Sequence, residues 1–225
     1  MKGTIRFVSG YRFFAVLFIL MRFLTCPTPV HAQGTGTQGQ NAVFGSSGCC
    51  VGSSAFLDAS ALAANVNNPD FCSVLNYVLL NKVPTTGAVI DARGLPGTTG
   101  TSMRCSASPW AGITSPPPST ILLPPGTIVI SSPWGLPSNT HLIGEGDNDP
   151  SNSTPGTTIQ VSGSFLAPGP LIQFGSSAGA TGISVERLTL DGKGMTSTNG
   201  IVNQYAGTNS YVDHVALCRI RFRPL

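Results

Sequence analysis

Two pairs of charged or polar residues occupy the same place in a repeated pattern of this sequence. Val185-Glu186-Arg187-Leu188-Thr189-Leu190 matches Val212-Asp213-His214-Val215-Ala216-Leu217 at an offset of 27 residues. Within each copy, the apolar residues before and after the pair have opposite parity. Side chains alternate between the two faces of a strand. Both apolar groups can therefore point inward only if the chain turns a corner at Glu186-Arg187 and again at Asp213-His214.

Stacking these two corners would bring carboxylates together. Neighbouring strands lie ~4.8 Å apart, which places Glu186 beside Asp213 and Arg187 beside His214. A base next to a carboxylate-bound calcium ion could abstract a proton while the cation stabilises the charge that forms. Glu186, Asp213 and His214 are therefore candidate catalytic residues, and Glu186 and Asp213 are candidate calcium ligands. In the alternative interpretation these residues are polar because a corner faces water, and motifs this short often carry no chemistry.

Other apolar runs also repeat. Thr127-Ile128-Val129-Ile130-Ser131 matches Thr158-Ile159-Gln160-Val161-Ser162 at an offset of 31, and Leu142-Ile143 precedes Leu171-Ile172 by 29 residues. Short strands with a loose period of 27 to 31 residues predict an all-β solenoid, whose stacked coils share one core. A two-sheet sandwich is the competing fold, but it does not predict corners that recur in register. The expected strands are 88–91, 120–123, 127–131, 140–143, 158–161, 171–174, 183–190, 200–203 and 211–217.

One helix is expected before these strands. Asn68 is a suitable cap residue, Pro69 fits the first helical position, and apolar residues then follow at helical spacing until Pro84. The pattern predicts a helix over residues 68–81.

The N-terminus has the features of an export signal. Lys2, Arg6 and Arg12 precede an apolar run, and Val30-His31-Ala32 offers small residues for cleavage, so residues 1–32 are interpreted as a signal peptide. The apolar run is shorter than the ~20 residues that span a bilayer. We therefore expect a secreted protein, extracellular or periplasmic, that is not held in a membrane after cleavage. Residues 33–54 read as a flexible Gly/Ser/Thr-rich leader.

The charge composition limits the classes of partner that we expect. Charged residues make up only 9% of the chain, and removing residues 1–32 leaves eight basic and nine acidic residues. Nucleic acid is not expected as a partner, because binding it would need a basic stripe.

The order of several motifs resembles the pectate lyase superfamily, in particular its rhamnogalacturonase- and epimerase-like branch. These motifs span residues 55–217 and follow the expected helix: Val89-Ile90-Asp91-Ala92-Arg93-Gly94, Ile121-Leu122-Leu123-Pro124-Pro125-Gly126-Thr127, His141-Leu142-Ile143-Gly144-Glu145-Gly146 and Leu188-Thr189-Leu190-Asp191-Gly192. Val212-Asp213-His214 is similar to a segment of pectate lyases in which the Asp helps to bind calcium.

The resemblance implies a right-handed parallel β-helix over residues 55–225 with an N-terminal capping helix, and a polysaccharide as partner. Such a cap would cover the open edge of the first coil. The paired Asp, Gly-His-Gly and Arg-Ile-Lys motifs of polygalacturonases do not occur here. Whether the chain is an enzyme, a polysaccharide lyase or a glycoside hydrolase, is therefore left open. The alternative is a non-catalytic β-helix that binds glycans or attaches to surfaces.

Cysteines offer a link between cap and coils. Cys72 falls on the expected helix and Cys105 in the loop after the first strand, so a disulfide between them would tie the cap to the first coil. The pairing of Cys49, Cys50 and Cys218 stays open, as does the oligomeric state.

The pattern of coils also runs up to the last residues of the sequence without a capping element. We therefore expect the N-terminal portion of such a domain, which aggregates or is only marginally stable when isolated. Two aromatic residues, Trp110 and Trp134, could stack on sugar rings or pack under a loop.

Overall fold

Parallel strand pairing dominates the computed structural model. The structure describes residues 55–97, 103–146, 156–165, 169–175, 179–195 and 198–220. The expected signal peptide and leader, with Cys49 and Cys50, lie outside the described residues. All described residues belong to the second of two units of the chain, Gly39–Leu225. None of their helices is long and apolar enough to cross a membrane.

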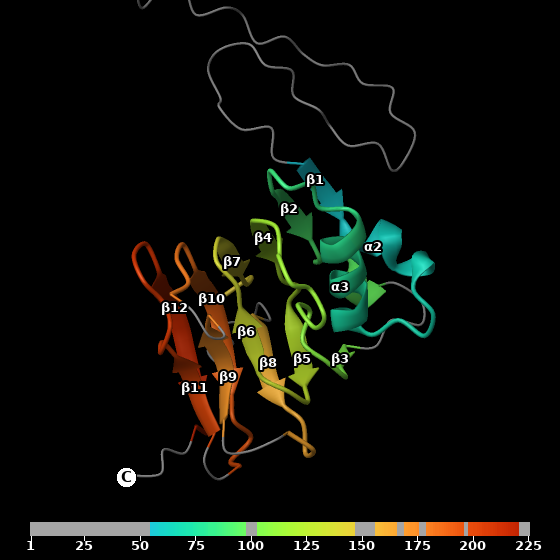
Figure 1. Ribbon diagram of the computed structural model, residues 1–225. Helices are drawn as coiled ribbons and strands as arrows, with labels where there is room; N and C mark the ends of the chain where they lie inside the picture. Colours follow the sequence, from blue (N-terminus) through green and yellow to red (C-terminus); the bar gives the residue numbers. More distant parts are fainter. Residues whose placement is uncertain are drawn as a thin grey trace, which may run out of the picture. The chain divides into compact units, whose positions relative to one another are not determined.

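Twelve strands and a few short helices make up the described part of the chain (Figure 1). The strands are β1 Ala55–Asp58, β2 Ala88–Asp91, β3 Arg104–Cys105, β4 Ser119–Leu122, β5 Gly126–Ile130, β6 Trp134–Leu136, β7 Thr140–Ile143, β8 Thr157–Val161, β9 Gly169–Phe174, β10 Ser184–Asp191, β11 Thr198–Val202 and β12 Tyr211–Cys218. The helices are α2 Ala59–Leu62, α3 Phe71–Asn81, and the 3-10 helices η1 Ala63–Asn65 and η2 Leu95–Gly97.

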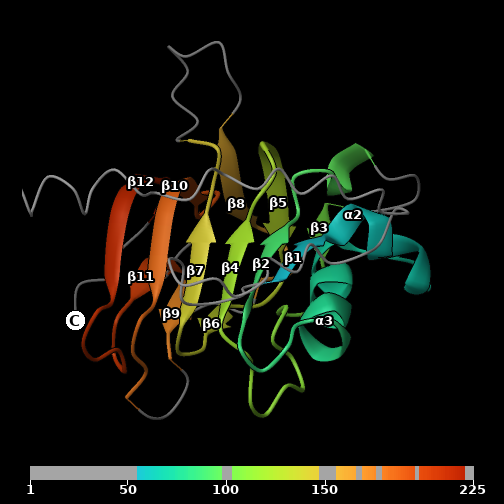
Figure 2. The same ribbon diagram turned by 90° about the horizontal axis from the view of Figure 1, so that it is seen from above.

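The strands form two parallel sheets. The nine-stranded sheet has the order β1-β2-β4-β7-β10-β8-β5-β3, with β12 also paired to β10, and the three-stranded sheet has the order β11-β9-β6. Seen from above, β1, β2, β4, β7, β10 and β12 lie side by side (Figure 2). The described structure is thus mostly β, with parallel strands that curl round an axis, which is compatible with the expected solenoid.

The curl of the larger sheet depends on β10. The first residues of this strand pair with β7 and the last ones with β8. Between the two halves, Arg187 has a φ of 55°, and His214 at the equivalent place in β12 has a φ of 48°. Few residues other than glycine adopt this left-handed conformation. Both predicted corners therefore coincide with a residue in the left-handed conformation, at which the strand departs from regular extended geometry.

Two of the three predicted repeat registers are confirmed. Thr127 pairs with Thr158, at the offset of 31, and Val185 pairs with Val212, at the offset of 27. The third is wrong, because Leu142 lies in the nine-stranded sheet and Leu171 in the three-stranded sheet. An apolar pair suits any strand that is buried on one side, so the match of two residues did not identify equivalent strands.

Inward side chains form continuous apolar ladders across the nine-stranded sheet. Their register follows the strand pairing, and all members are buried except those on β12. One ladder contains Leu57, Ile90, Ile121, Leu142, Val185 and Val212, and a second contains Ile128, Ile159, Leu190 and Leu217. Each strand thus buries its apolar face against its neighbours, and the core runs along the axis of the curl.

The main helix begins later than predicted. Asp70, not Asn68, caps α3: its Oδ1 accepts a hydrogen bond of 2.6 Å from the backbone N–H of Ser73, and the Ser73 hydroxyl accepts one of 2.9 Å from the backbone N–H of Asp70. This reciprocal capping box satisfies two backbone donors, whereas Asn68 has a φ of 48° and lies outside the helix. The short helix α2, capped by Asp58, was not predicted.

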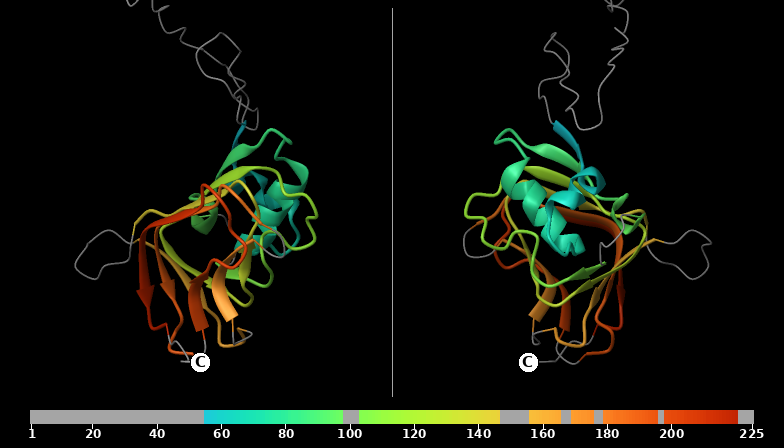
Figure 3. Two further views of the ribbon diagram at one scale, coloured as in Figure 1. Left: turned by 60° about the vertical axis from the view of Figure 1, so that its left-hand side comes forward. Right: turned by 90° about the vertical axis from the view of Figure 1, so that its right-hand side faces the viewer.

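Helices α2 and α3 lie across one end of the curled sheets (Figure 3, right). The inner face of α3 is fully buried in the same core as the ladders. Cys72 of α3 and Cys105 of β3 are joined by a disulfide bond. Beside it, Asp70 Oδ2 accepts hydrogen bonds from the backbone N–H and the hydroxyl of Ser106, at 3.0 and 2.7 Å. The helix is therefore held to the first coil by both a covalent and a polar link.

We predict that replacing Cys72 and Cys105 together by Ala destabilises the protein by about 3–4 kcal/mol, because the disulfide closes a loop between residues 33 apart. Denaturant unfolding measures the change. Cys218→Ser is the matched control, since Cys218 is an exposed free thiol whose replacement should leave the unfolding midpoint unchanged. Equal midpoints for the double variant and the control would contradict the prediction.

Candidate functional site on the outer face of the sheet

Polar side chains gather on the outer face of the nine-stranded sheet, where β7, β10 and β12 run side by side. Ser184 of β10 is the register partner of both His141 on β7 and Tyr211 on β12. After the inward Val185, the next outward residue of β10 is Glu186. It is the register partner of Ile143 on β7 and of Asp213 on β12. Three neighbouring strands therefore bring these residues together, although they come from distant parts of the sequence.

Four of these side chains form a hydrogen-bonded array, which we call the outer-face array: His141, Ser184, Glu186 and Tyr211. The Ser184 hydroxyl donates to Glu186 Oε1 at 2.7 Å, and the Tyr211 hydroxyl donates to the same oxygen at 2.8 Å. His141 Nδ1 lies 2.8 Å from Ser184 Oγ. Because the Ser184 proton points to Glu186, the hydrogen-bond pattern assigns Nδ1 of His141 as the donor. In the neutral ring Nε2 is then a hydrogen-bond acceptor.

The four residues of the array differ in how far they are exposed to solvent, and this limits what each can do. Ser184 is fully buried, so it can relay a hydrogen bond but cannot act as a nucleophile on a bulky substrate. His141 and Glu186 are half-buried, and Tyr211 is 50% exposed. The hydrogen bond to the Glu186 carboxylate is the main cause that raises the pKa of Tyr211 above its ordinary value. Tyr211 is therefore a protonated donor at neutral pH, with its ring accessible to a ligand.

The predicted catalytic and calcium-binding residues lie at the edge of this array. Glu186 and Asp213 are register partners, as the repeat predicted. Each carboxylate, however, already has protein partners: Glu186 binds Ser184 and Tyr211, and Asp213 Oδ1 lies 2.8 Å from Nδ1 of His214. Calcium takes six to eight oxygen ligands. In the described part of the chain, no group of three or more His, Cys, Asp or Glu residues could hold a metal ion.

The corner beside the array is hollowed. A cavity of about 470 Å³ is lined by Arg187, Asp213, His214 and Val215, with Gly146 and Ala216. The side chains of Asp213 and His214 are both largely exposed. This cavity therefore gives the outer-face array a neighbouring recess with charged groups of both signs.

Two other carboxylates have structural partners. Asp91 forms an ion pair of 2.8 Å with Arg93, and the hydrogen bond from Arg93 is the main cause that lowers the pKa of Asp91. Asp191 is almost fully buried and forms an ion pair with Arg219. It also accepts hydrogen bonds from the side chain of Gln160 at 2.7 Å and from the backbone N–H of Lys193 at 2.8 Å. Both carboxylates thus form ion pairs at the last residue of a strand, β2 for Asp91 and β10 for Asp191.

Asp191 titrates differently from an exposed carboxyl group. Burial acts to raise its pKa, but the hydrogen bonds from Arg219, Lys193 and Gln160 outweigh burial and lower the pKa below the ordinary value. Because Arg219 follows β12 directly, this group of bonds fixes the end of the last described strand.

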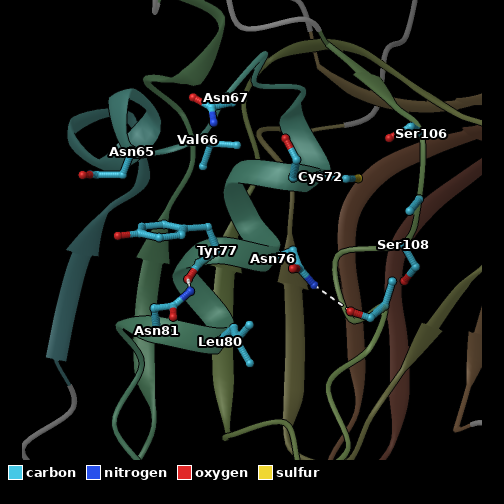
Figure 4. A pocket seen from close by; sticks show the side chains of 13 residues that line it. Asn65, Val66, Asn67, Cys72, Asn76, Tyr77, Leu80, Asn81, Ser106 and Ser108 are labelled. Carbon is cyan, nitrogen blue, oxygen red and sulfur yellow. Dashed lines mark hydrogen bonds between the residues drawn. The ribbon is translucent and has the colours of Figure 1, made fainter.

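A second recess lies on the outside of α3 (Figure 4). This cavity of about 440 Å³ is lined mainly by Asn and Ser side chains, with Tyr77 and Leu80. The Asn76 amide donates hydrogen bonds of 2.9 Å to the carbonyls of Pro109 and Ala111, so it holds the loop after β3 against the helix. No charged side chain lines this recess, and its polar groups serve the attachment of α3.

The two tryptophans pack inside the protein. Trp110 and Trp134 are both buried, with their ring centroids 6.2 Å apart in an edge-on arrangement. Of the two roles that the sequence left open for these residues, the structure shows the packing role. Neither ring has an exposed face that could stack on a sugar.

No family model matches this chain. Neither the curated proteins nor the solved structures contain a significant match to it.

Sequence reasoning missed most of the outer-face array. His141 was quoted only as part of a motif, whereas in the structure it is half-buried on the outer face and hydrogen-bonded to Ser184. The offset of 27 does connect Ser184 with Tyr211, and a search for polar partners at this offset could have found that pair. The pairing of His141 with Ser184 had no such signal, because these residues are 43 positions apart, outside the expected period.

We predict that Glu186→Gln lowers the pKa of Tyr211 toward ~10, because the neutral amide no longer favours the protonated phenol. Titration followed by the ultraviolet absorbance of tyrosinate measures this change. The same titration of Tyr211→Phe identifies which part of the signal belongs to Tyr211. An unchanged titration of Tyr211 in the Glu186 variant would contradict the hydrogen bond.

We also predict an acid dependence that belongs to Asp191. Its pKa is lowered in the folded state, so its contribution to stability is present above the unfolded value of ~3.9 and is lost as the pH falls through the folded pKa. Asp191→Asn should be less stable at neutral pH and should lose less stability between pH ~5 and ~2. Urea unfolding at several pH values measures both effects, and parallel curves for the two proteins would refute the assignment.

Proposed function

We propose that this chain is a secreted, right-handed parallel β-helix of the pectate lyase superfamily type, and that it binds polysaccharide on the outer face of the nine-stranded sheet. Three features support the proposal. The parallel strands curl round an axis, and helices α2 and α3 lie across one end of the sheets. The sequence carries motifs that resemble that superfamily. The expected signal peptide would export the protein to where polysaccharides occur. The outer-face array is the observation that carries the proposal.

The array offers the groups that a sugar requires. The exposed ring of Tyr211 can pack against the C–H face of a sugar, as aromatic rings do with apolar surfaces. The Glu186 carboxylate and the Nε2 atom of His141 can accept hydrogen bonds from sugar hydroxyl groups. Because Glu186 is already oriented by Ser184 and Tyr211, little side-chain entropy is lost when it binds a ligand.

The charge of the face favours a neutral polysaccharide. Glu186 of the array and Asp213 beside it are register partners, so two carboxylates occupy adjacent strands. A polyuronate would bring further negative charge to this place, and like charges at short distance repel each other. We therefore propose neutral glycans as the preferred ligand class.

Binding is better supported than cleavage. Glycoside hydrolysis requires two carboxyl groups on either side of the scissile bond, and calcium-assisted elimination requires a set of oxygen ligands for the cation. In the outer-face array the single carboxylate, Glu186, accepts two internal hydrogen bonds. Recognition needs only the acceptors and the ring that the array presents.

We predict that the chain binds neutral polysaccharides more tightly than polyuronates, and that Tyr211→Ala weakens binding by about five- to ten-fold through loss of ring packing. Tyr211→Phe keeps the ring and should bind more tightly than Tyr211→Ala. Isothermal titration calorimetry with a panel of both polysaccharide classes measures these differences.

Tyr77→Ala is the matched control, because Tyr77 lines the recess on α3, away from the array. Its affinity should equal that of the unaltered chain. Loss of binding in the Tyr77 variant alone would move the site to the α3 recess, and binding to no member of the panel would overturn the proposed function.

A further inference from the structure

The outer face of the sheet continues beyond the array onto β4, the strand next to β7 (Figure 2). Thr120 of β4 is the register partner of His141, and Leu122 of β4 is the register partner of Ile143. Both strands lie inside the sheet, because β4 also pairs with β2 and β7 also pairs with β10. The surface over β4 and β7 is therefore not a strand edge, and the backbones beneath it have their pairing partners.

Two aliphatic side chains point outward from these strands, and we call them the platform: Leu122 and Ile143. Their chain neighbours Ile121, Leu123 and Leu142 point inward and are fully buried, whereas both platform residues are half-buried. In the described part of the chain, neither belongs to the core or to the residues packed against it. Adjacent strands lie ~4.8 Å apart, so the two side chains form one apolar surface. Such a surface can pack against the C–H face of a sugar ring.

A pair of polar groups borders the platform. Thr120 and His141 occupy the preceding outward positions of the same two strands, and both are half-buried. Nε2 of the neutral His141 ring is a hydrogen-bond acceptor, as the array assigns. Among the described residues the Thr120 hydroxyl has no hydrogen-bond partner, so it can both donate and accept. The two groups can therefore bind two hydroxyl groups of one sugar unit.

The surface between the flanking carboxylates is free of fixed charge. Glu186 is the register partner of Ile143 on one side, and Asp91 is the register partner of Leu122 on the other. Glu186 already accepts two hydrogen bonds, and Asp91 is paired with Arg93. Strands β4 and β7 themselves contain no Asp, Glu, Lys or Arg. This arrangement suits a neutral sugar, which needs hydrogen bonds and an apolar contact but no counter-charge.

We propose that the platform, Thr120 and His141 form a second sugar subsite, and that the ligand is a neutral glycan of several units that crosses from β12 to β4. This inference rests on the proposed function, because His141 is shared with the outer-face array. Tyr211 and Thr120 are separated by three strand spacings, or ~14 Å. One sugar ring cannot contact both, so linked units are required to occupy the array and the second subsite together.

A series of ligand lengths tests this requirement. The probes are glucose, mannose, galactose and xylose, each as the monosaccharide and as a linear hexasaccharide, titrated into the full chain by isothermal calorimetry. We expect a hexasaccharide to bind at least about ten-fold more tightly than its monosaccharide, because its second contact is made within the same complex. Equal affinities for the two lengths would overturn the second subsite and would leave the array as a site for one sugar unit.

The Thr120 hydroxyl is tested by two substitutions. Thr120→Val keeps the shape of the side chain and should bind the hexasaccharide about five-fold more weakly, because one hydrogen bond is lost. Thr120→Ser restores the hydroxyl and should bind as tightly as the unaltered chain. Thr127→Val is the matched control, since Thr127 is exposed on β5, in the other half of the curled sheet. Unchanged affinity in Thr120→Val, or an equal loss in Thr127→Val, would contradict the assigned contact.

The platform is tested by Leu122→Ser, which should weaken hexasaccharide binding about five- to ten-fold through loss of apolar contact. Circular dichroism checks that the variant is folded. If Tyr211→Ala weakens binding but Leu122→Ser and Thr120→Val do not, the second subsite is refuted and the proposed function stands. If the unaltered chain binds no saccharide of the series, the inference is overturned, and the polysaccharide panel alone decides the proposed function.

Discussion

Parallel register is the constraint on which this structure depends. When β-strands pair in parallel, each residue has a fixed partner on the next strand, so an inward side chain always meets another inward side chain. The ladder from Leu57 to Val185 is buried throughout because every member is apolar. The outer face obeys the same rule. The register that aligns Leu142 with Val185 also aligns His141 with Ser184, so core and candidate site are two consequences of one pairing.

The corners make this register compatible with a curled sheet. Arg187 and His214 adopt a positive φ, which reverses the order of inward and outward residues between the two halves of β10 and β12. Without that reversal, either Val185 or Leu190 would have to leave the core. Leu190 then packs between Ile159 and Leu217 in the second ladder. The polar pairs at the corners are therefore explained by the geometry of the curl, before any catalytic role is considered.

Local patterns in the sequence predicted much of the fold. The strands at 88–91 and 140–143 have the predicted bounds, because alternation and flanking turn residues are local signals. Strands β1, β3 and β6 were missed. Strand β1 directly follows the segment interpreted as a leader, and two or three residues such as Trp134-Gly135-Leu136 carry no readable alternation. The helix start was placed at Asn68 because Pro69 follows it. The capping box of Asp70 and Ser73 decides the start instead. The pairing of β7 with β10 could not be predicted, because it depends on a connection whose length differs from that of the other coils.

Unequal coil lengths also explain where the candidate site lies. Successive partners on the outer face are 21, 43 and 27 residues apart, from Thr120 to His141, from His141 to Ser184 and from Ser184 to Tyr211. Extra residues in a loop cost little, since the entropy of closing a loop grows only slowly with its length, and the ladder registers are unaffected by them. Outward positions beside a long connection are consequently free to change without loss of the core. The outer-face array combines such positions, with one buried hydroxyl joining an imidazole, a carboxylate and a phenol. Core packing alone does not require this combination of side chains, which is why the array is the basis of the proposed binding site.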